Sequence, residues 1–139
     1  MSRVVAAARG WIGTPYRHGA SCRGAGCDCL GLVRGIWREL YGAEPGVVPP
    51  YGPDWSEVAG EERLWRAARQ HLGPAGPDLA PGDLLLFRMR AGAVAKHLGI
   101  ATGTGRFVHA YSGHGVVESA LSGAWARRVV ARFRFPLEG

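Results

Sequence analysis

One cysteine and two histidines have the residue types and positions needed to cleave an amide bond. Cys29 follows Asp28 at the start of a segment whose apolar residues recur at helical spacing. The first turn of a helix has unpaired N–H groups and a positive dipole end, which favour the nucleophilic thiolate over the thiol. A cysteine nucleophile also needs a base that protonates the leaving amine, and His97 and His109 are the histidines that strand spacing favours. We therefore predict a thiol-dependent hydrolase with Cys29 as its nucleophile.

The two histidines are expected on neighbouring strands joined by a short turn at 103–105. A three-residue loop there, with glycine available for positive φ, places Ile100 opposite Val108. In that register His97 and His109 share one face of the hairpin at a diagonal spacing, so one ring can orient the other. A two-residue loop would place the histidines on opposite faces, so the prediction depends on the register.

The elements that must position these residues come in two blocks along the chain. Helices are predicted at 3–12, 29–41 and 56–72, and Asp28 and Gly42 are the expected caps of the second. After residue 83 apolar residues recur every second position, which is typical of strands. The five predicted strands are 84–90, 97–102, 106–111, 116–120 and 127–135.

Helices followed by antiparallel strands favour an α+β fold rather than a βαβ sheet. We expect the N-terminal helices to pack on a five-stranded antiparallel sheet within a single domain, 1–139. The chain of 139 residues is 47% hydrophobic and 20% charged, which excludes general disorder.

Charge and hydropathy limit the partners and the compartment. The net charge of +6 favours an anionic partner, but no predicted helix combines a basic stripe with aromatic residues, so nucleic acid is not expected. The strongest apolar stretch, 84–87, is far shorter than the roughly 18 residues of a membrane span, so membrane insertion is not expected. The five-residue apolar run at 4–8 is too short for a secretion signal, which needs about 7–15, so we expect synthesis in the cytoplasm without export.

Other interpretations of the same residues stay open. A lone cysteine is more often a small buried apolar residue than a nucleophile. A zinc-binding module is a second possibility, because four potential ligands occur within 18–29. Their spacing matches no common zinc finger, where ligands come in closely spaced pairs. These potential ligands are His18, Cys22, Cys27 and Cys29.

Four motifs in order resemble the NlpC/P60 family of cysteine peptidases. They are Gly13-Thr14-Pro15-Tyr16-Arg17-His18-Gly19-Ala20, Asp28-Cys29-Leu30-Gly31-Leu32-Val33, His97-Leu98-Gly99-Ile100 and His109-Ala110. The resemblance implies a papain-like α+β fold and a Cys-His-His triad that needs no cofactor or metal. In that triad Cys29 is the nucleophile, His97 the base and acid, and His109 the group that orients His97.

The resemblance also implies a substrate, which is the peptidoglycan stem peptide, often cut between D-glutamate and the following diamino acid. Tyr16 is then expected beside the nucleophile, lining the substrate site or stabilising the oxyanion, and we assign Asp28 to substrate binding as well. Leu30 stands where the family usually has serine, and Ala20 where it usually has glycine. Leu30 makes the wall of the site more apolar.

The loop 22–27 is longer than the family minimum and resembles the versions encoded with phage tails and gene transfer agents. This implies a component of the tail hub or baseplate of a phage-like particle, at the tail tip, acting in the periplasm of the target cell. The basic composition suits an anionic wall and also acidic tail subunits as docking partners. The alternative from another functional class is a non-catalytic tail adaptor that retains the fold.

Overall fold

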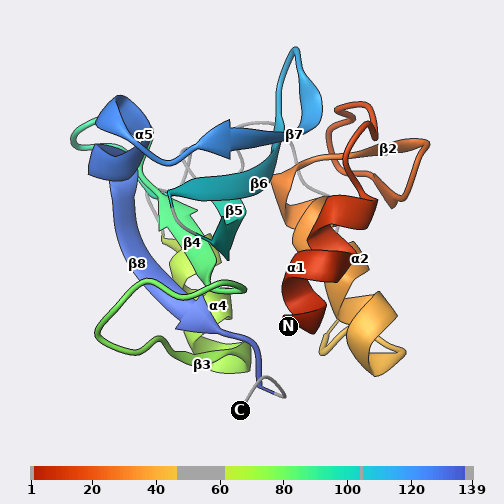
Figure 1. The fold of residues 1–139 in the computed structure, drawn as a ribbon, viewed down its shortest axis with the longest axis horizontal. Coiled ribbons are helices and arrows are strands. Elements are labelled where there is room, and N and C mark those ends of the chain that lie inside the picture. The colour runs from red at the N-terminus through yellow and green to blue at the C-terminus, as the bar shows by residue number, and fades with distance from the viewer. Residues whose placement is uncertain (1, 47–61, 104, 137–139) are drawn as a thin grey trace.

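The computed structural model describes residues 2–46, 62–103 and 105–136, and Figure 1 shows their arrangement. Its described helices are α1 (Arg3–Gly10), α2 (Cys29–Tyr41), α4 (Arg63–His71) and α5 (Gly123–Arg128). Its described strands are β1 (Ser21–Cys22), β2 (Gly26–Cys27), β3 (Gly73–Pro74), β4 (Leu84–Phe87), β5 (His97–Gly103), β6 (Arg106–Tyr111), β7 (Gly115–Ala120) and β8 (Val129–Arg134). None of the helices within these ranges is long and apolar enough to cross a membrane.

Helix α2 has the bounds and caps that the sequence predicts. The Asp28 side chain accepts a hydrogen bond from the Gly31 N–H at the start of the helix. Gly42 ends the helix in the left-handed region, with φ of 88°, where glycine has no Cβ to clash. The helix is therefore fixed at both ends by local sequence, and its first residue is Cys29.

The sheet confirms antiparallel pairing but has one strand more than expected. Six strands pair in the order β3-β8-β4-β5-β6-β7, and β1 and β2 form a separate two-stranded sheet. The prediction of five strands is wrong because β3 has only two residues, Gly73 and Pro74, and so carries no alternating pattern. These residues pair with Phe133 and Arg134 of β8, far along the chain.

Other boundaries differ from the expected ones. Strand β4 ends at Phe87 rather than at residue 90, and residues 127–128 belong to α5 rather than to the last strand. The first helix ends at Gly10 rather than at residue 12. Of the third predicted helix, residues 56–61 lie outside the described ranges, and α4 covers Arg63–His71.

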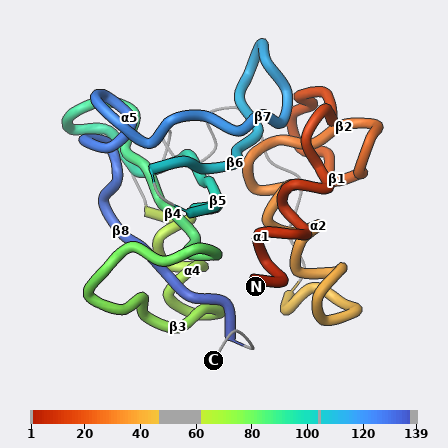
Figure 2. Tube along the Cα trace, in the orientation of Figure 1, coloured from red at the N-terminus to blue at the C-terminus, as the bar shows by residue number. Residues whose placement is uncertain are grey.

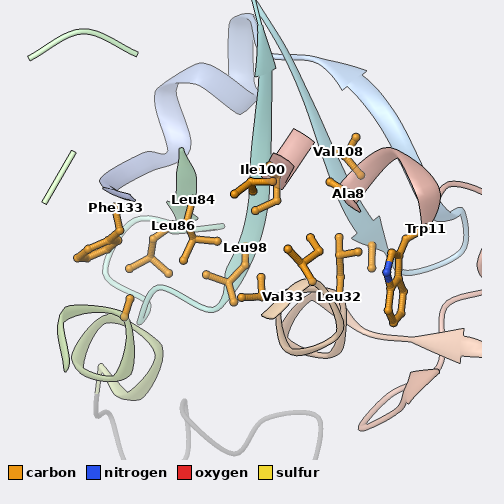
Figure 3. Packing of buried hydrophobic residues seen from close by; sticks show 14 of the residues in the cluster. Ala8, Trp11, Leu32, Val33, Leu84, Leu86, Leu98, Ile100, Val108 and Phe133 are labelled. Atoms are coloured by element: carbon orange, nitrogen blue, oxygen red, sulfur yellow. The ribbon is translucent and has the colours of Figure 1, made fainter. Parts of the chain in front are cut away.

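The two faces of the large sheet pack against different elements. On one face, α2 contributes Leu32 and Val33 to the main core, and Trp11 follows directly after α1; they lie opposite Leu98 and Ile100 of β5 (Figure 3). A smaller cluster lies apart from this core and is made by Leu85, Phe87, Ala101 and Phe107, with Trp125 of α5 and Val129 packed against it. Side chains along β5 therefore alternate between the faces: Leu98 and Ile100 face the main core, and Ala101 faces the second cluster.

The hairpin that carries the two histidines has the expected central register. Ile100 pairs with Val108, as predicted. The predicted three-residue turn at 103–105 is wrong, because Gly103 belongs to β5 and pairs with Arg106. A bulge between Ala101 and Gly103 compensates for the shorter turn. The bulge lies beyond the histidines, so they keep the same face.

The segment between α1 and α2 folds back beside the β6–β7 hairpin (Figure 2). Backbone hydrogen bonds join them, from the Gly13 N–H to the Val116 carbonyl and from the Val116 N–H to the Thr14 carbonyl. This attachment brings the residues that precede Cys29 in sequence next to the sheet that carries the histidines.

Candidate active site

Helix α2 directs its first residue at the backbone of β5. The Cys29 thiol donates to the carbonyl oxygen of Lys96, with 3.6 Å between sulfur and oxygen. The backbone N–H groups of Leu98, Leu30 and Cys29 also act on the sulfur and lower the pKa of the thiol. Because Lys96 and Leu98 flank His97, the sulfur lies beside the strand position that carries this histidine.

The two predicted histidines meet on one face of the sheet. His97 Nε2 lies 2.8 Å from His109 Nδ1, and both residues are buried, with 8% and 0% of their surface exposed. This contact leaves Nδ1 as the remaining ring nitrogen of His97. The strand-parity argument is therefore confirmed for the pair.

His109 has a second partner that the sequence analysis missed. Its Nε2 lies 3.0 Å from the hydroxyl oxygen of Ser119 on β7. In the β6–β7 register His109 pairs with Val117 and Phe107 pairs with Ser119, so Ser119 is the diagonal neighbour of His109 on the same face. Parity along β7 could have found it, but only after the register of this second hairpin was known.

Trp125 of α5 covers the histidine pair and was also missed. Its ring centroid lies 5.4 Å from that of His97 and 4.9 Å from that of His109. The Arg128 guanidinium carbon lies 5.5 Å from the centroid of the same indole ring. A six-residue helix between two strands carries no periodic signal in the sequence, so nothing there indicated this contact.

Tyr16 is held beside Cys27, two residues before the candidate nucleophile Cys29, by backbone pairing. The Cys27 N–H donates to the Pro15 carbonyl and the Arg17 N–H donates to the Cys27 carbonyl, which forms a parallel bridge between Tyr16 and Cys27. Burial, together with Cys29 and neighbouring acidic groups, raises the pKa of Tyr16 to about 12. The phenol is therefore a protonated donor at neutral pH, and its part in substrate binding stays a prediction.

The Asp28 carboxylate connects the tyrosine segment to the helix. One oxygen accepts from the Gly31 N–H at 2.7 Å, and the other accepts from the Gly19 N–H at 2.8 Å. His18 Nδ1 lies 3.7 Å from the second oxygen. Only 3% of Asp28 is exposed, so these contacts give it a structural role, and the predicted role in substrate binding stays a prediction.

Burial determines the protonation of the site. It lowers the pKa of His97 to about 3, with further lowering from His109 and Arg128. It lowers the pKa of His109 to about 4, with His114 adding to the effect. Both rings are therefore neutral at neutral pH.

The surroundings of the half-buried Cys29 favour the thiol over the expected thiolate. Burial raises the pKa of Cys29 to about 12, and the Asp28 carboxylate raises it further. The N–H groups at the helix start act in the opposite direction, but desolvation of the sulfur outweighs them. The site therefore holds a neutral thiol and neutral imidazoles.

The alternative zinc site is not formed. Cys22 is exposed and Cys27 is buried. In the β1–β2 register Cys27 pairs with Ser21 and Cys22 pairs with Gly26, so the two thiols lie on opposite faces. Within residues 2–46, 62–103 and 105–136, no three His, Cys, Asp or Glu side chains are grouped so that they could hold a metal ion.

Comparison with known sequences gives the family. The profile of the NlpC/P60 family matches residues 13–134, which is most of the chain. This chain belongs to the NlpC/P60 family. It is 32% identical over 138 residues to murein DD-endopeptidase MepS/murein LD-carboxypeptidase of Escherichia coli, covering 94% of this chain and 64% of that protein. It is also 29% identical to the gamma-DL-glutamyl hydrolase of Bacillus subtilis, over 95% of this chain and 29% of that protein.

Solved structures of NlpC/P60 proteins have the same fold. The NlpC/P60 domain of peptidoglycan hydrolase SagA superposes with a TM-score of 0.62 at 25% identity, covering 96% of this chain and 97% of that chain. An NlpC/P60 protein from Bacillus cereus superposes with a TM-score of 0.67 at 18% identity, covering 96% of this chain and 39% of that chain. The chain spans less than two thirds of the full length of MepS, so it corresponds to only a part of that relative.

Proposed function

We propose that this protein is a peptidoglycan endopeptidase that uses Cys29, His97 and His109. The observation that carries the proposal is the Cys29 thiol at the start of α2, held against the backbone of Lys96 and Leu98 on both sides of His97, whose ring contacts His109. Family membership and the murein endopeptidase relative support the reaction class.

The neutral resting state implies that proton transfer accompanies attack. His97 takes the Cys29 proton as sulfur bonds to the amide carbon and the carbonyl electron pair moves to oxygen. The Cys29 N–H at the helix start is the expected donor to that oxyanion. Collapse breaks the C–N bond, and His97 gives its proton to the leaving amine. Water, deprotonated by His97, then attacks the thioester, and the sulfur leaves and is reprotonated.

The substrate proposed is the stem peptide of peptidoglycan, cut between D-glutamate and the diamino acid. The relatives are named for cleaving murein and gamma-DL-glutamyl bonds, which supports a bond next to a D-residue. Tyr16, which interacts with the Cys29 thiol, and Leu30, which follows Cys29 in the sequence, are the side chains proposed to contact the peptide.

Digestion of purified sacculi tests this proposal. We expect wild-type protein to release muropeptides whose masses identify the bond, and Cys29→Ala to release none. Cys22→Ala is the matched control, because Cys22 is an exposed thiol on β1, which belongs to the separate two-stranded sheet. Intact sacculi after treatment with folded wild-type protein would favour the non-catalytic adaptor instead.

We also propose that the enzyme acts as a tail-hub component of a phage-like particle, made in the cytoplasm and delivered at the tail tip to the periplasm of the target cell. The basic net charge of +6 and the loop 22–27 support this location. Mass spectrometry of purified particles should then find the chain in a few fixed copies. Abundant protein in the cytosol with none in the particle would overturn the location and leave the chemistry unchanged.

A further inference from the structure

The hydrogen-bond chain behind His97 does not end at His109. His97 Nε2 contacts His109 Nδ1 at 2.8 Å, and His109 Nε2 contacts the Ser119 hydroxyl at 3.0 Å. Every ring nitrogen of the pair except His97 Nδ1 therefore has a polar side-chain partner. We propose that Ser119 is a positioning residue for the reaction, acting through His109 on the tautomer of His97.

The position of the proton shared by the two histidines explains the role of Ser119. Two neutral imidazoles share one proton across the His97–His109 contact. If His97 Nε2 carries it, then Nδ1 of His97 is unprotonated and can accept the thiol proton. His109 must then carry its own proton on Nε2, and the Ser119 oxygen accepts it. If His109 Nδ1 carries the shared proton instead, His97 is protonated on Nδ1 and cannot act as a base.

The surroundings of His109 make the serine hydroxyl important. Phe107 and Tyr111 lie on the same strand face, with ring centroids 4.2 and 5.4 Å from that of His109, and Trp125 closes the third side. A buried N–H group without an acceptor costs far more than one facing water. Without the Ser119 oxygen, the proton on His109 Nε2 would face mostly apolar rings, and the unproductive tautomer would gain population.

Two charged or titratable groups also face the pair. Arg128 of α5 lies over the Trp125 ring and lowers the pKa of His97. His114, after β6, stacks on Tyr111 and lowers the pKa of His109. Arg128 and His114 both disfavour protonation of the histidine pair. A neutral acceptor such as the Ser119 hydroxyl therefore matches the neutral histidines at the end of the hydrogen-bond chain.

The test compares Ser119→Ala, Ser119→Thr and wild type on a soluble stem peptide. Because one buried hydrogen bond is lost, we expect Ser119→Ala to lower kcat about tenfold with little change in KM. Ser119→Thr keeps the hydroxyl and should restore most of kcat. Ser122→Ala is the matched control, because Ser122 is exposed and its side chain makes no cap hydrogen bond to α5.

Nitrogen-15 NMR of the imidazoles gives a readout that does not depend on activity. We expect the Nε2–H tautomer for both histidines in the wild type, and increased Nδ1–H tautomer in Ser119→Ala. A kcat loss with unchanged tautomers would overturn the inference, as would unchanged kcat in folded Ser119→Ala.

Ser119→Asp provides an independent variant if alanine impairs folding. A carboxylate beside His109 favours the charged ring, so the acid limb of the pH profile should move to higher pH. No movement in a folded variant would also overturn the inference. The kinetic measurements rest on the proposed function, whereas the NMR measurement of the tautomers does not. An inactive wild type with the expected tautomers would contradict the function and leave the positioning role supported.

Discussion

At the scale of single residues, the surroundings of the site favour a neutral Cys29 thiol and a neutral His97 ring over a thiolate–imidazolium ion pair. The Cys29 sulfur has three N–H groups acting on it, yet burial keeps its pKa high, and burial keeps the pKa of His97 low. A thiol and an imidazole with these pKa values exchange a proton only when the developing oxyanion and the new S–C bond compensate for the charge. The low-dielectric surroundings thus tie proton transfer to substrate attack.

The pH dependence of the rate follows from the lowered pKa of His97. The base form of His97 is the neutral ring, which is present above its pKa of about 3. We therefore expect kcat/KM on a soluble stem peptide to stay nearly constant from pH 7 down to pH 5. A histidine with its ordinary pKa of about 6.5 would lose about 25-fold over the same interval. A pH–rate profile with an acid limb near 6.5 would contradict the assignment of His97 as a buried neutral base.

The sequence predicted where the three candidate residues lie in the fold but not what surrounds them. Cys29 was placed correctly because Asp28 and the apolar spacing after it define a helix start from local information alone. The histidine pair followed from parity in one short hairpin. Ser119 and Trp125 depend on a second hairpin register and on the packing of a short helix, which are tertiary properties. The expectation of a thiolate left out desolvation of the sulfur for the same reason, because desolvation depends on tertiary packing and not on the neighbouring residues in the sequence.

At the scale of elements, α5 acts as a cover for the histidine face. Trp125 is its least exposed apolar side chain and contacts both imidazoles and Phe87. Desolvation is the largest cause of the low pKa of both histidines. The helix therefore keeps water away from the rings.

Removal of the indole should raise the pKa of the histidine pair. In Trp125→Ala, water reaches the rings, so we expect the acid limb of kcat/KM to move toward pH 6.5 and activity at pH 5 to fall relative to pH 7. Trp125→Phe should give a smaller shift because part of the cover remains. The matched control is Arg127→Ala, an exposed position of the same helix. Identical pH profiles for folded wild type and Trp125→Ala would show that α5 does not exclude water from the site.

The contact between α1 and α2 depends on a glycine. A Cβ at Gly35 would collide with the Trp11 indole ring. That ring is 1% exposed, and its Nε1–H donates to Glu39 at 2.6 Å, so it cannot easily move aside. The close approach of the two helices therefore requires the absence of a side chain at this position.

Gly35→Ala should accordingly lower the free energy of unfolding by about 1–3 kcal/mol, as expected for overpacking of a core. Gly46→Ala is the matched control, because a Cβ there meets open space and its effect should stay within about 0.5 kcal/mol. Urea unfolding of the two variants measures the difference. Equal stability of Gly35→Ala and wild type would mean that the helices separate at little cost.

The elements themselves were predictable where they are long. Helix α2 and strands β5 and β6 follow from caps and alternation, and they are the elements that carry Cys29, His97 and His109. Strand β3 and helix α5 are too short to have a period, and each forms because a distant partner packs on it. The boundary between α5 and β8 was missed because Val129 begins a strand directly after the helix ends.

At the scale of the whole molecule, the net charge would govern binding to the proposed anionic substrate, the cell wall polymer. The 17 basic and 11 acidic side chains give +6, and several of the arginines pair with acidic partners, as in the contact of Arg132 with the buried Asp83 at 2.8 Å. The remaining positive charge attracts anions over a distance that becomes shorter as the salt concentration rises. The contacts among His97, His109 and Ser119, in contrast, are short and largely buried, where screening is weak.

Binding to sacculi should therefore depend on salt, whereas cleavage of a short peptide should not. We expect the fraction of Cys29→Ala that sediments with sacculi to fall when NaCl rises from about 0.05 M to about 0.5 M, because screening shortens to well below 10 Å over that range. The inactive variant keeps the polymer intact during the measurement. Wild-type kcat/KM on a soluble stem peptide serves as the control and should change less than the bound fraction. Sedimentation that is independent of salt would show that apolar or hydrogen-bonded contacts, rather than the net charge, hold the protein on the wall.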